Sequence, residues 1–291
     1  MIEIRYVPNE FGPFVRHTDL PTTMEYGFYY EAKMKLPFAK EERFVRVWLP
    51  GSYDFLAPKK HPVLYMSDGQ NLVDKYLTAY GDWHLDRVIH ELQRKGLPEP
   101  ILVGIDSPRD SAQRANELNP PYTVRRKIRK RHNGPDRPIG NQFVGYIIKD
   151  LKPLIDSIFS TDPRREATGI GGSSMGGIMA FYGWLCYPDT FGFSLSFSVP
   201  FFFYSKRDLR RILNLHYPLP RTHGRLAMFV GGKGFEKVFT KDVLYVVKKL
   251  RKRGFDESRM RFYLNEDLEH HEESWYQYAE PALRFWLENL R

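Results

Sequence analysis

The stretch Gly172-Ser173-Ser174-Met175-Gly176 decides the fold. It follows an apolar run that predicts a strand at 167–171 and precedes a predicted helix at 177–187, the order that a nucleophile elbow requires. A serine at the centre of such a turn has a strained backbone, so the residues two before and two after it must be small, as both glycines are. The turn would place the Ser174 hydroxyl at the carboxyl edge of a sheet, beside free N–H groups that can stabilise an oxyanion. Ser174 is therefore the candidate nucleophile, and the Met175 N–H is the candidate oxyanion donor.

Strands and helices alternate on both sides of this turn. Short apolar runs predict further strands at 26–34, 44–49, 62–66, 101–105, 193–198, 226–230 and 260–264. Amphipathic patterns predict further helices at 83–94, 144–159, 241–253 and 273–290. The first two strands are expected to form an antiparallel pair, and the later alternation predicts a mostly parallel sheet with helices on both faces. The expected fold class is α/β, in one domain spanning residues 1–291 with residues 1–25 as a peripheral N-terminal segment.

Two long segments, 107–142 and 200–224, interrupt the alternation. Loops of this length are more often functional covers than connectors, so we expect two inserted loops that shape the site. The first contains a basic segment whose cations are Arg125, Arg126, Lys127, Arg129, Lys130 and Arg131. One hypothesis is that this segment lies near the site and raises the local concentration of anionic substrates; the other is a solvated loop with no role.

The composition is typical of a globular protein, with 42% hydrophobic and 27% charged residues among 291. A net charge of +9 suits an anionic partner, but one basic run without a recognised nucleic-acid module argues against nucleic acid. The single cysteine, Cys186, excludes an internal disulfide and lies in an apolar run, where a buried thiol is expected. The sequence has neither an apolar signal segment nor a run of membrane-spanning length, so we expect a cytoplasmic chain without a membrane partner. The sequence leaves the oligomeric state open.

A general base for Ser174 must be a histidine, because a serine hydroxyl is a weak nucleophile near neutral pH. In this arrangement the histidine follows the last strand, and His270 and His271 lie directly after the predicted strand 260–264. Adjacent histidines also suggest a metal, but H-E-x-x-H spacing is missing and no cysteine lies nearby. We therefore expect neither a metal nor an organic cofactor.

The acid that orients the histidine should lie on the loop after the strand 226–230. Glu236 is the first carboxylate on that loop. Asp242 is the alternative, but it falls in the first turn of the predicted helix 241–253, where the helix dipole gives it a structural role. We favour Glu236, which would hold the imidazole tautomer and stabilise the imidazolium.

At these residues the chain resembles the putative-esterase family of α/β-hydrolases, which includes feruloyl esterases, S-formylglutathione hydrolase, ferric-enterobactin esterases and mycolyltransferases. The resemblance runs from about Arg43 to the C-terminus. It rests on LYMSDGQNL at 64–72, on Trp83, on GSSMGG at 172–177 and on EHHEESW at 269–275. It implies an α/β-hydrolase fold with Ser174 as nucleophile and His270 as the histidine, while His271 falls where many relatives have asparagine.

The resemblance also covers the oxyanion hole and the acid. Asp68-Gly69-Gln70 corresponds to the loop that shapes the second half of the hole, which implies that Gly69 or Gln70 donates the other N–H. At the acid the chain departs from the family, because Lys233, Gly234 and Phe235 precede Glu236. Relatives commonly place Asp or Glu within a few residues of the glycine that ends the strand.

Two further residues are candidates for substrate binding, Arg114 and Trp83. Arg114 and Glu117 resemble an R-x-x-E element that the family has in the loop beside the active site. Arg114 could bind a substrate carboxylate, but we expect it to pair with Glu117 and brace the loop.

The sequence therefore predicts a serine carboxylic-ester hydrolase that acts through an acyl-enzyme on a small-molecule ester, with anionic esters among the candidates. The acyl and alcohol groups cannot be named from these residues. The alternative, from a different class, is a catalytically weakened binding or scaffold protein that uses the same fold and its basic surface.

Overall fold

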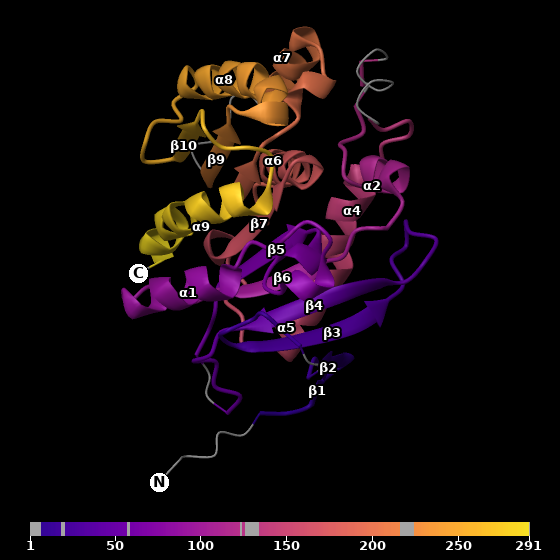
Figure 1. The fold of residues 1–291 in the computed structure, drawn as a ribbon, viewed down its shortest axis with the longest axis vertical. Helices are drawn as coiled ribbons and strands as arrows, with labels where there is room; N and C mark the ends of the chain where they lie inside the picture. Colours follow the sequence, from indigo (N-terminus) through magenta and orange to yellow (C-terminus); the bar gives the residue numbers. More distant parts are fainter. Residues whose placement is uncertain are drawn as a thin grey trace.

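A computed structural model describes residues 7–18, 21–56, 59–122, 124–125, 134–215 and 224–290. Its described strands form one ten-stranded sheet in the order β1-β2-β3-β4-β6-β5-β7-β8-β9-β10, which runs from the N-terminal end of the molecule to β9 and β10 beside α8 (Figure 1). The strands are β1 (Glu10–Phe11), β2 (Phe14–Arg16), β3 (Phe28–Met34), β4 (Arg43–Leu49), β5 (Val63–Ser67), β6 (Ile101–Ile105), β7 (Thr168–Ser173), β8 (Phe193–Phe197), β9 (Arg225–Gly231) and β10 (Met260–Asn265). β1 to β4 pair antiparallel, and all pairs from β6 to β10 are parallel.

Helices cover both faces of the sheet. They are α1 (Leu85–Arg94), α2 (Ser111–Glu117), α4 (Gly140–Tyr146), α5 (Lys152–Ile158), α6 (Met175–Cys186), α7 (Lys206–Leu215), α8 (Lys237–Arg251) and α9 (Glu272–Leu287). Side chains alternate between the faces of a strand, so β5 contributes to two cores. Val63 and Tyr65 join the core with α4 to α8, whereas Leu64 and Met66 join the core with α1 and α9, which lie side by side (Figure 1). Burial on both faces explains why the central parallel strands read as continuous apolar runs.

The α/β-hydrolase fold class expected from the sequence is confirmed, including the antiparallel pair β3–β4. Residues 10–16 add two short strands, β1 at the edge of the sheet and β2 beside it, within the segment expected to be peripheral. The helix expected at 144–159 begins at Gly140, and a π-helical turn at Ile147–Leu151 joins α4 to α5. Helix α8 begins at Lys237 rather than at 241, because the 3-10 turn Gly234–Glu236 leads directly into it.

The expectation that the two long segments are loops was wrong in part, because each contains a helix. The Asp110 side chain accepts from the Gln113 N–H (2.6 Å) and caps α2. Helix α7 buries Leu209, Ile212 and Leu213, whose helical spacing was readable in the sequence. No helix in the described part of the chain is both long and apolar enough to cross a membrane.

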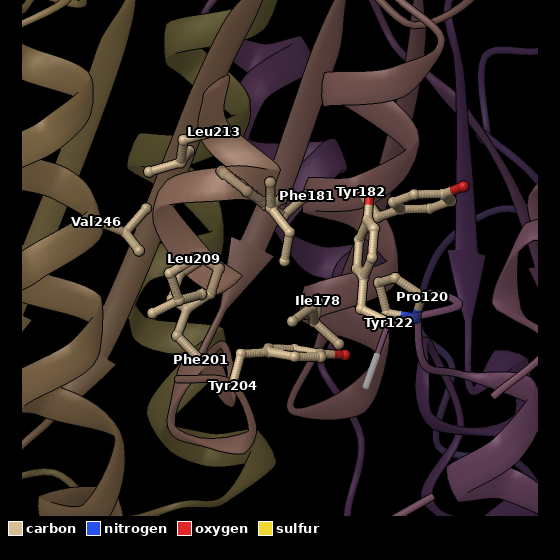
Figure 2. Close-up of a pocket in the computed structure, with 11 residues that line it drawn as sticks. Pro120, Tyr122, Ile178, Phe181, Tyr182, Phe201, Tyr204, Leu209, Leu213 and Val246 are labelled. Carbon is tan, nitrogen blue, oxygen red and sulfur yellow. The ribbon is translucent and has the colours of Figure 1, made fainter. Parts of the chain in front are cut away.

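The two long segments meet over α6 and enclose an apolar cavity (Figure 2). Pro120 and Tyr122 line it from the first segment, Tyr204 and Leu209 from the second, and Ile178 from α6. Its volume of about 10 Å³ is at the lower limit for a single water molecule, and mostly apolar side chains line it. The cavity as it stands is therefore too small for a substrate.

Candidate active site

Ser174 lies at the turn between β7 and α6, with φ 54° and ψ −122°, a costly conformation for a residue that has a side chain. Its N–H donates to the carbonyl of Phe197 at the end of β8 (3.0 Å). A Cβ on Gly176 would lie 2.1 Å from Ser67 Oγ, and one on Gly172 would lie 2.7 Å from both the same oxygen and the Gly176 carbonyl carbon. The backbone at Ser174 is therefore strained, and Gly172 and Gly176 make close contacts that a side chain would prevent. Both features are those that a nucleophile elbow requires.

Met175 is the first residue of α6. The first N–H groups of a helix have no carbonyl partner within that helix, so they form a site of positive potential. The Met175 N–H is thus one of the helix N-terminal groups that lie next to Ser174 in the chain.

Glu236 and His270 are joined by a hydrogen bond although 34 residues separate them. Nδ1 of His270 lies 3.0 Å from Oε1 of Glu236, which is fully buried at the end of the 3-10 turn after β9. A buried carboxylate that accepts from Nδ1–H fixes the tautomer in which Nε2 is free to take a proton.

Three aromatic rings hold the imidazole of His270. It stacks on Phe239 (centroids 4.7 Å apart) and has edge contacts with Phe235 (5.4 Å) and Trp275 (5.1 Å). With its ring orientation limited by packing and its Nδ1 held by Glu236, the side chain has little freedom to turn away from the sheet edge.

Ser198, which the sequence analysis did not single out, is a second partner of Glu236. It follows β8 with φ 47°, is fully buried, and donates its hydroxyl hydrogen to Glu236 Oε1. Trp275 Nε1 in turn donates to Ser198 Oγ (2.9 Å). Only the position of Ser198 after a strand at the same sheet edge could have signalled this role.

Ser174 and His270 both lie at the carboxyl edge of the sheet. Within the described residues, no hydrogen bond joins the Ser174 hydroxyl to His270. In enzymes without bound substrate this bond is often long and shortens when substrate binds.

His271 and Asp242, the alternatives to His270 and Glu236, do not take part in the hydrogen bond between those two residues. His271 is exposed and is the N-cap of α9, where its ring accepts from the Glu273 N–H (3.3 Å). Asp242 was expected in the first turn of its helix, but α8 begins earlier and places Asp242 in the second turn. Among the described residues, Glu236 is the carboxylate that His270 contacts.

The turn after β5 holds the residues expected to complete the oxyanion hole. Asp68 has left-handed backbone angles (φ 55°, ψ 49°) and precedes the 3-10 turn Gly69–Asn71. A Cβ on Gly69 would lie 2.7 Å from the carbonyl carbon of Gly104, so the turn packs tightly on β6. The Gln70 side chain accepts from the Ser107 N–H (3.2 Å), which leaves its backbone N–H as the group to consider for an oxyanion.

Arg114 pairs with Asp68 and not with Glu117, so the expected partner was wrong. Nε and Nη2 of Arg114 lie 2.7 and 2.8 Å from the two oxygens of Asp68, a bidentate pair that the Ser107 hydroxyl supports with a further hydrogen bond. Burial raises the pKa of Asp68, but the Arg114 guanidinium outweighs it and holds that pKa below its ordinary value. Glu117 is instead 3.2 Å from Arg43 on β4. Arg114 braces its loop, as expected, but it does so through Asp68 in the turn after β5 and not through Glu117 in its own helix.

Trp83 is a core residue and not a substrate contact, because only 2% of its surface is exposed. It stacks on Phe197 (5.4 Å) and lies 5.6 Å from Trp275. Trp83 therefore supports the end of β8, to which the Ser174 N–H is bonded.

The sequence also led us to expect a site without a metal ion and a basic segment at 125–131. No group of three or more His, Cys, Asp or Glu in the described ranges is arranged to hold a metal ion. Of the basic segment only Arg125 is described, and its N–H donates to the carbonyl of Phe203 (2.9 Å). The cations at 126–131 lie outside the described residues.

Comparisons with known proteins give the family. The profile of the family described as "Putative esterase" matches residues 38–222. The uncharacterized protein YbbA of Bacillus subtilis (strain 168) is 24% identical over 239 residues, 80% of this chain and 87% of that protein.

Solved structures share the fold. They include an IroE-like serine hydrolase from Shewanella oneidensis (TM-score 0.66, 20% identity, 92% of this chain and 81% of that chain). The BES protein from Bacillus cereus has a TM-score of 0.67, 17% identity, and coverage of 94% and 98%. The enterobactin esterase FES from Shigella flexneri, in the presence of enterobactin, has a TM-score of 0.66, 20% identity, and coverage of 94% and 60%.

The family profile spans more than half of the chain but ends before Glu236 and His270, so it does not bear on those two residues. The chain belongs to the putative-esterase family of α/β-hydrolases and is a carboxylic ester hydrolase.

Proposed function

We propose that Ser174, His270 and Glu236 act as a catalytic triad. Ser174 Oγ attacks the ester carbonyl carbon while Nε2 of His270 takes the hydroxyl proton, and the alcohol leaves with that proton. Water then attacks the acyl-enzyme with His270 again as base, which releases the acid and restores Ser174. The observation that carries the proposal is the hydrogen bond between buried Glu236 and His270 Nδ1.

The oxyanion hole is proposed to consist of the Met175 N–H and one N–H from Gly69 or Gln70. β5 and β7 are adjacent parallel strands, so the turns that follow them lie at the same edge. A Cβ on Gly176 would lie 3.3 Å from Asp68 Oδ2, which supports a close approach of the two turns. Donors on both turns could thus bind one oxygen.

The substrate is proposed to be a small-molecule ester. Structural neighbours include a protein named as ferulic acid esterase, which favours an ester of an aromatic acid for the first screen. Arg114 is engaged by Asp68, so it is poorly suited to bind a substrate carboxylate. Steering of anionic esters by the basic segment stays a prediction.

Hydrolysis of short p-nitrophenyl esters tests the serine mechanism. Ser174→Ala should fold as the wild type does and lose essentially all turnover, by about 1,000-fold or more. Ser173→Ala is the matched control, because Ser173 is the adjacent serine of the same motif and is buried at the end of β7. Equal activity of Ser174→Ala and wild type would sink the serine mechanism, and an inactive wild type would favour the scaffold alternative.

A further inference from the structure

Glu272 is a buried carboxyl group for which the triad has no role. It is the first residue of α9, two positions after His270, and only 5% of its surface is exposed. Its neighbour Glu273 occupies the next position of the same helix turn with a largely exposed side chain. An acidic residue at a helix N-terminus is stabilising without burial, so the helix dipole does not explain why Glu272 points into the protein.

The Glu272 carboxyl contacts the turn proposed to supply the second oxyanion donor. Nδ2 of Asn71 donates to Glu272 Oε1 (2.9 Å) across a sequence separation of 201 residues. Asn71 is the last residue of the turn Gly69–Asn71, and its own backbone is bonded to Asp68 and Trp83. The hydrogen bond therefore connects two otherwise separate segments, one carrying His270 and one carrying Gly69 and Gln70.

Charged groups on three neighbouring segments interact with Glu272, and the loop at Gly81 packs against its Cβ. Asp68 faces it from the turn after β5, Arg114 from α2, and His270 from the segment before α9. Burial raises the pKa of Glu272 to about 7, with Asp68 adding to the rise and His270 opposing it. Glu272 is thus a group whose charge changes near neutral pH beside the proposed base.

We propose that Glu272 is a positioning residue that holds the segment carrying His270 against Asp68 and the turn Gly69–Asn71, which we name the oxyanion turn, through its hydrogen bond to Asn71. The positive charge of His270 in turn favours the carboxylate form of Glu272, because opposite charges stabilise each other. This inference rests on the proposed triad, since it gives Glu272 a role only if His270 is the base.

A double-mutant cycle tests the connection. Glu272→Ala and Asn71→Ala should each lower kcat by about tenfold with a smaller change in KM, because misplaced groups cost transition-state stabilisation. The double variant should lose no more than either single variant, because both remove one interaction. Glu273→Ala is the control and should keep wild-type kcat. Additive losses, or wild-type kcat in Glu272→Ala, would overturn the inference.

The variant Glu272→Gln separates positioning from mere folding. Glutamine keeps an oxygen that can accept from Asn71, so kcat at the pH optimum should stay within about threefold of wild type. It does not titrate, whereas burial raises the pKa of Glu272 to about 7, so the acidic limb of kcat/KM should change in this variant. An unchanged limb, or a loss of kcat as large as in Glu272→Ala, would contradict the proposal.

Labelling with a fluorophosphonate distinguishes the failure of this inference from failure of the triad. If wild type hydrolyses esters and is labelled at Ser174, while all Glu272 and Asn71 variants match it, only the role of Glu272 is wrong. If wild type is not labelled at Ser174, the triad fails and the role of Glu272 fails with it.

Discussion

The nucleophile elbow and the oxyanion turn follow adjacent parallel strands, yet different forces hold them. Both contain a non-glycine residue with positive φ, Ser174 at 54° and Asp68 at 55°. At the elbow, glycines allow backbone and side-chain atoms to approach so closely that a Cβ on Gly176 would lie 2.1 Å from Ser67 Oγ. At the turn, a bidentate ion pair between Asp68 and Arg114 holds the strained residue.

Of these two kinds of backbone strain, only the one at the elbow can be recognised in the sequence. Steric strain at the elbow is relieved by small residues close in sequence, so it leaves a local motif. Strain at Asp68 is opposed by Arg114, which is 46 residues away, so it leaves no local motif in the sequence.

The largest effect is expected at His270. His270→Ala should lower kcat by about 1,000-fold or more, because it removes the proposed general base. His271→Ala should lower it by less than about tenfold, because that ring caps α9. Ester hydrolysis by both variants checks this pair, and the reverse order would overturn the assignment of the base.

The steric account of the elbow predicts a severe effect at Gly176. Gly176→Ala should lower the free energy of unfolding by about 1–3 kcal/mol and reduce activity, because its Cβ meets Ser67 Oγ. Ser67→Ala in the same chain should recover part of the loss, since the nearest atom is then Asp68 Oδ2 at 3.3 Å. Gly145→Ala is the control, because a Cβ there meets nothing within 4 Å. Urea unfolding measures all three, and a harmless Gly176→Ala would refute the steric account.

The ion pair at the oxyanion turn predicts a pH-dependent effect. Arg114→Met should lower stability by about 2–3 kcal/mol at pH 7, because it leaves Asp68 buried without its cation. The folded state lowers the pKa of Asp68, so the pair stabilises the protein above the ordinary carboxyl range, and this contribution is lost as pH falls through the folded pKa. The difference between wild type and variant should therefore shrink in acid. Unfolding curves at several pH values check this, and a constant difference would mean that Arg114 acts through packing alone.

The smallest effect is expected at Ser198. Ser198→Ala removes the hydroxyl that donates to Glu236 and accepts from Trp275, which should cost about 1 kcal/mol of stability and about tenfold in kcat. Ser196→Ala offers a control, because that buried hydroxyl pairs with Ser194 and does not contact Glu236. Equal losses in both variants would remove Ser198 from the account of the site.

Much of the fold was predictable because its signals are local. Apolar runs placed the central strands within one or two residues, and chain order pointed to Ser174, Glu236 and His270 as candidates. Helices α2 and α7 were missed although Asp110 and the apolar spacing of α7 were readable, because both segments were interpreted as inserted loops from their length.

The supporting contacts could not be predicted. Ser198 with Glu236, Arg114 with Asp68, and Asn71 with Glu272 join residues 38, 46 and 201 positions apart. Each depends on which strands become neighbours, and Glu272 additionally on whether its side chain turns inward. Local patterns carry no information about either.

The most direct test of the central claim is to identify the residue that becomes covalently modified. Wild-type protein is treated with a fluorophosphonate, which traps an activated serine, and the adduct is located by peptide mass spectrometry. The account predicts one adduct on Ser174, none on Ser173, much slower labelling in His270→Ala, and no adduct in Ser174→Ala. An adduct on another residue, or undiminished ester hydrolysis by Ser174→Ala, would contradict it.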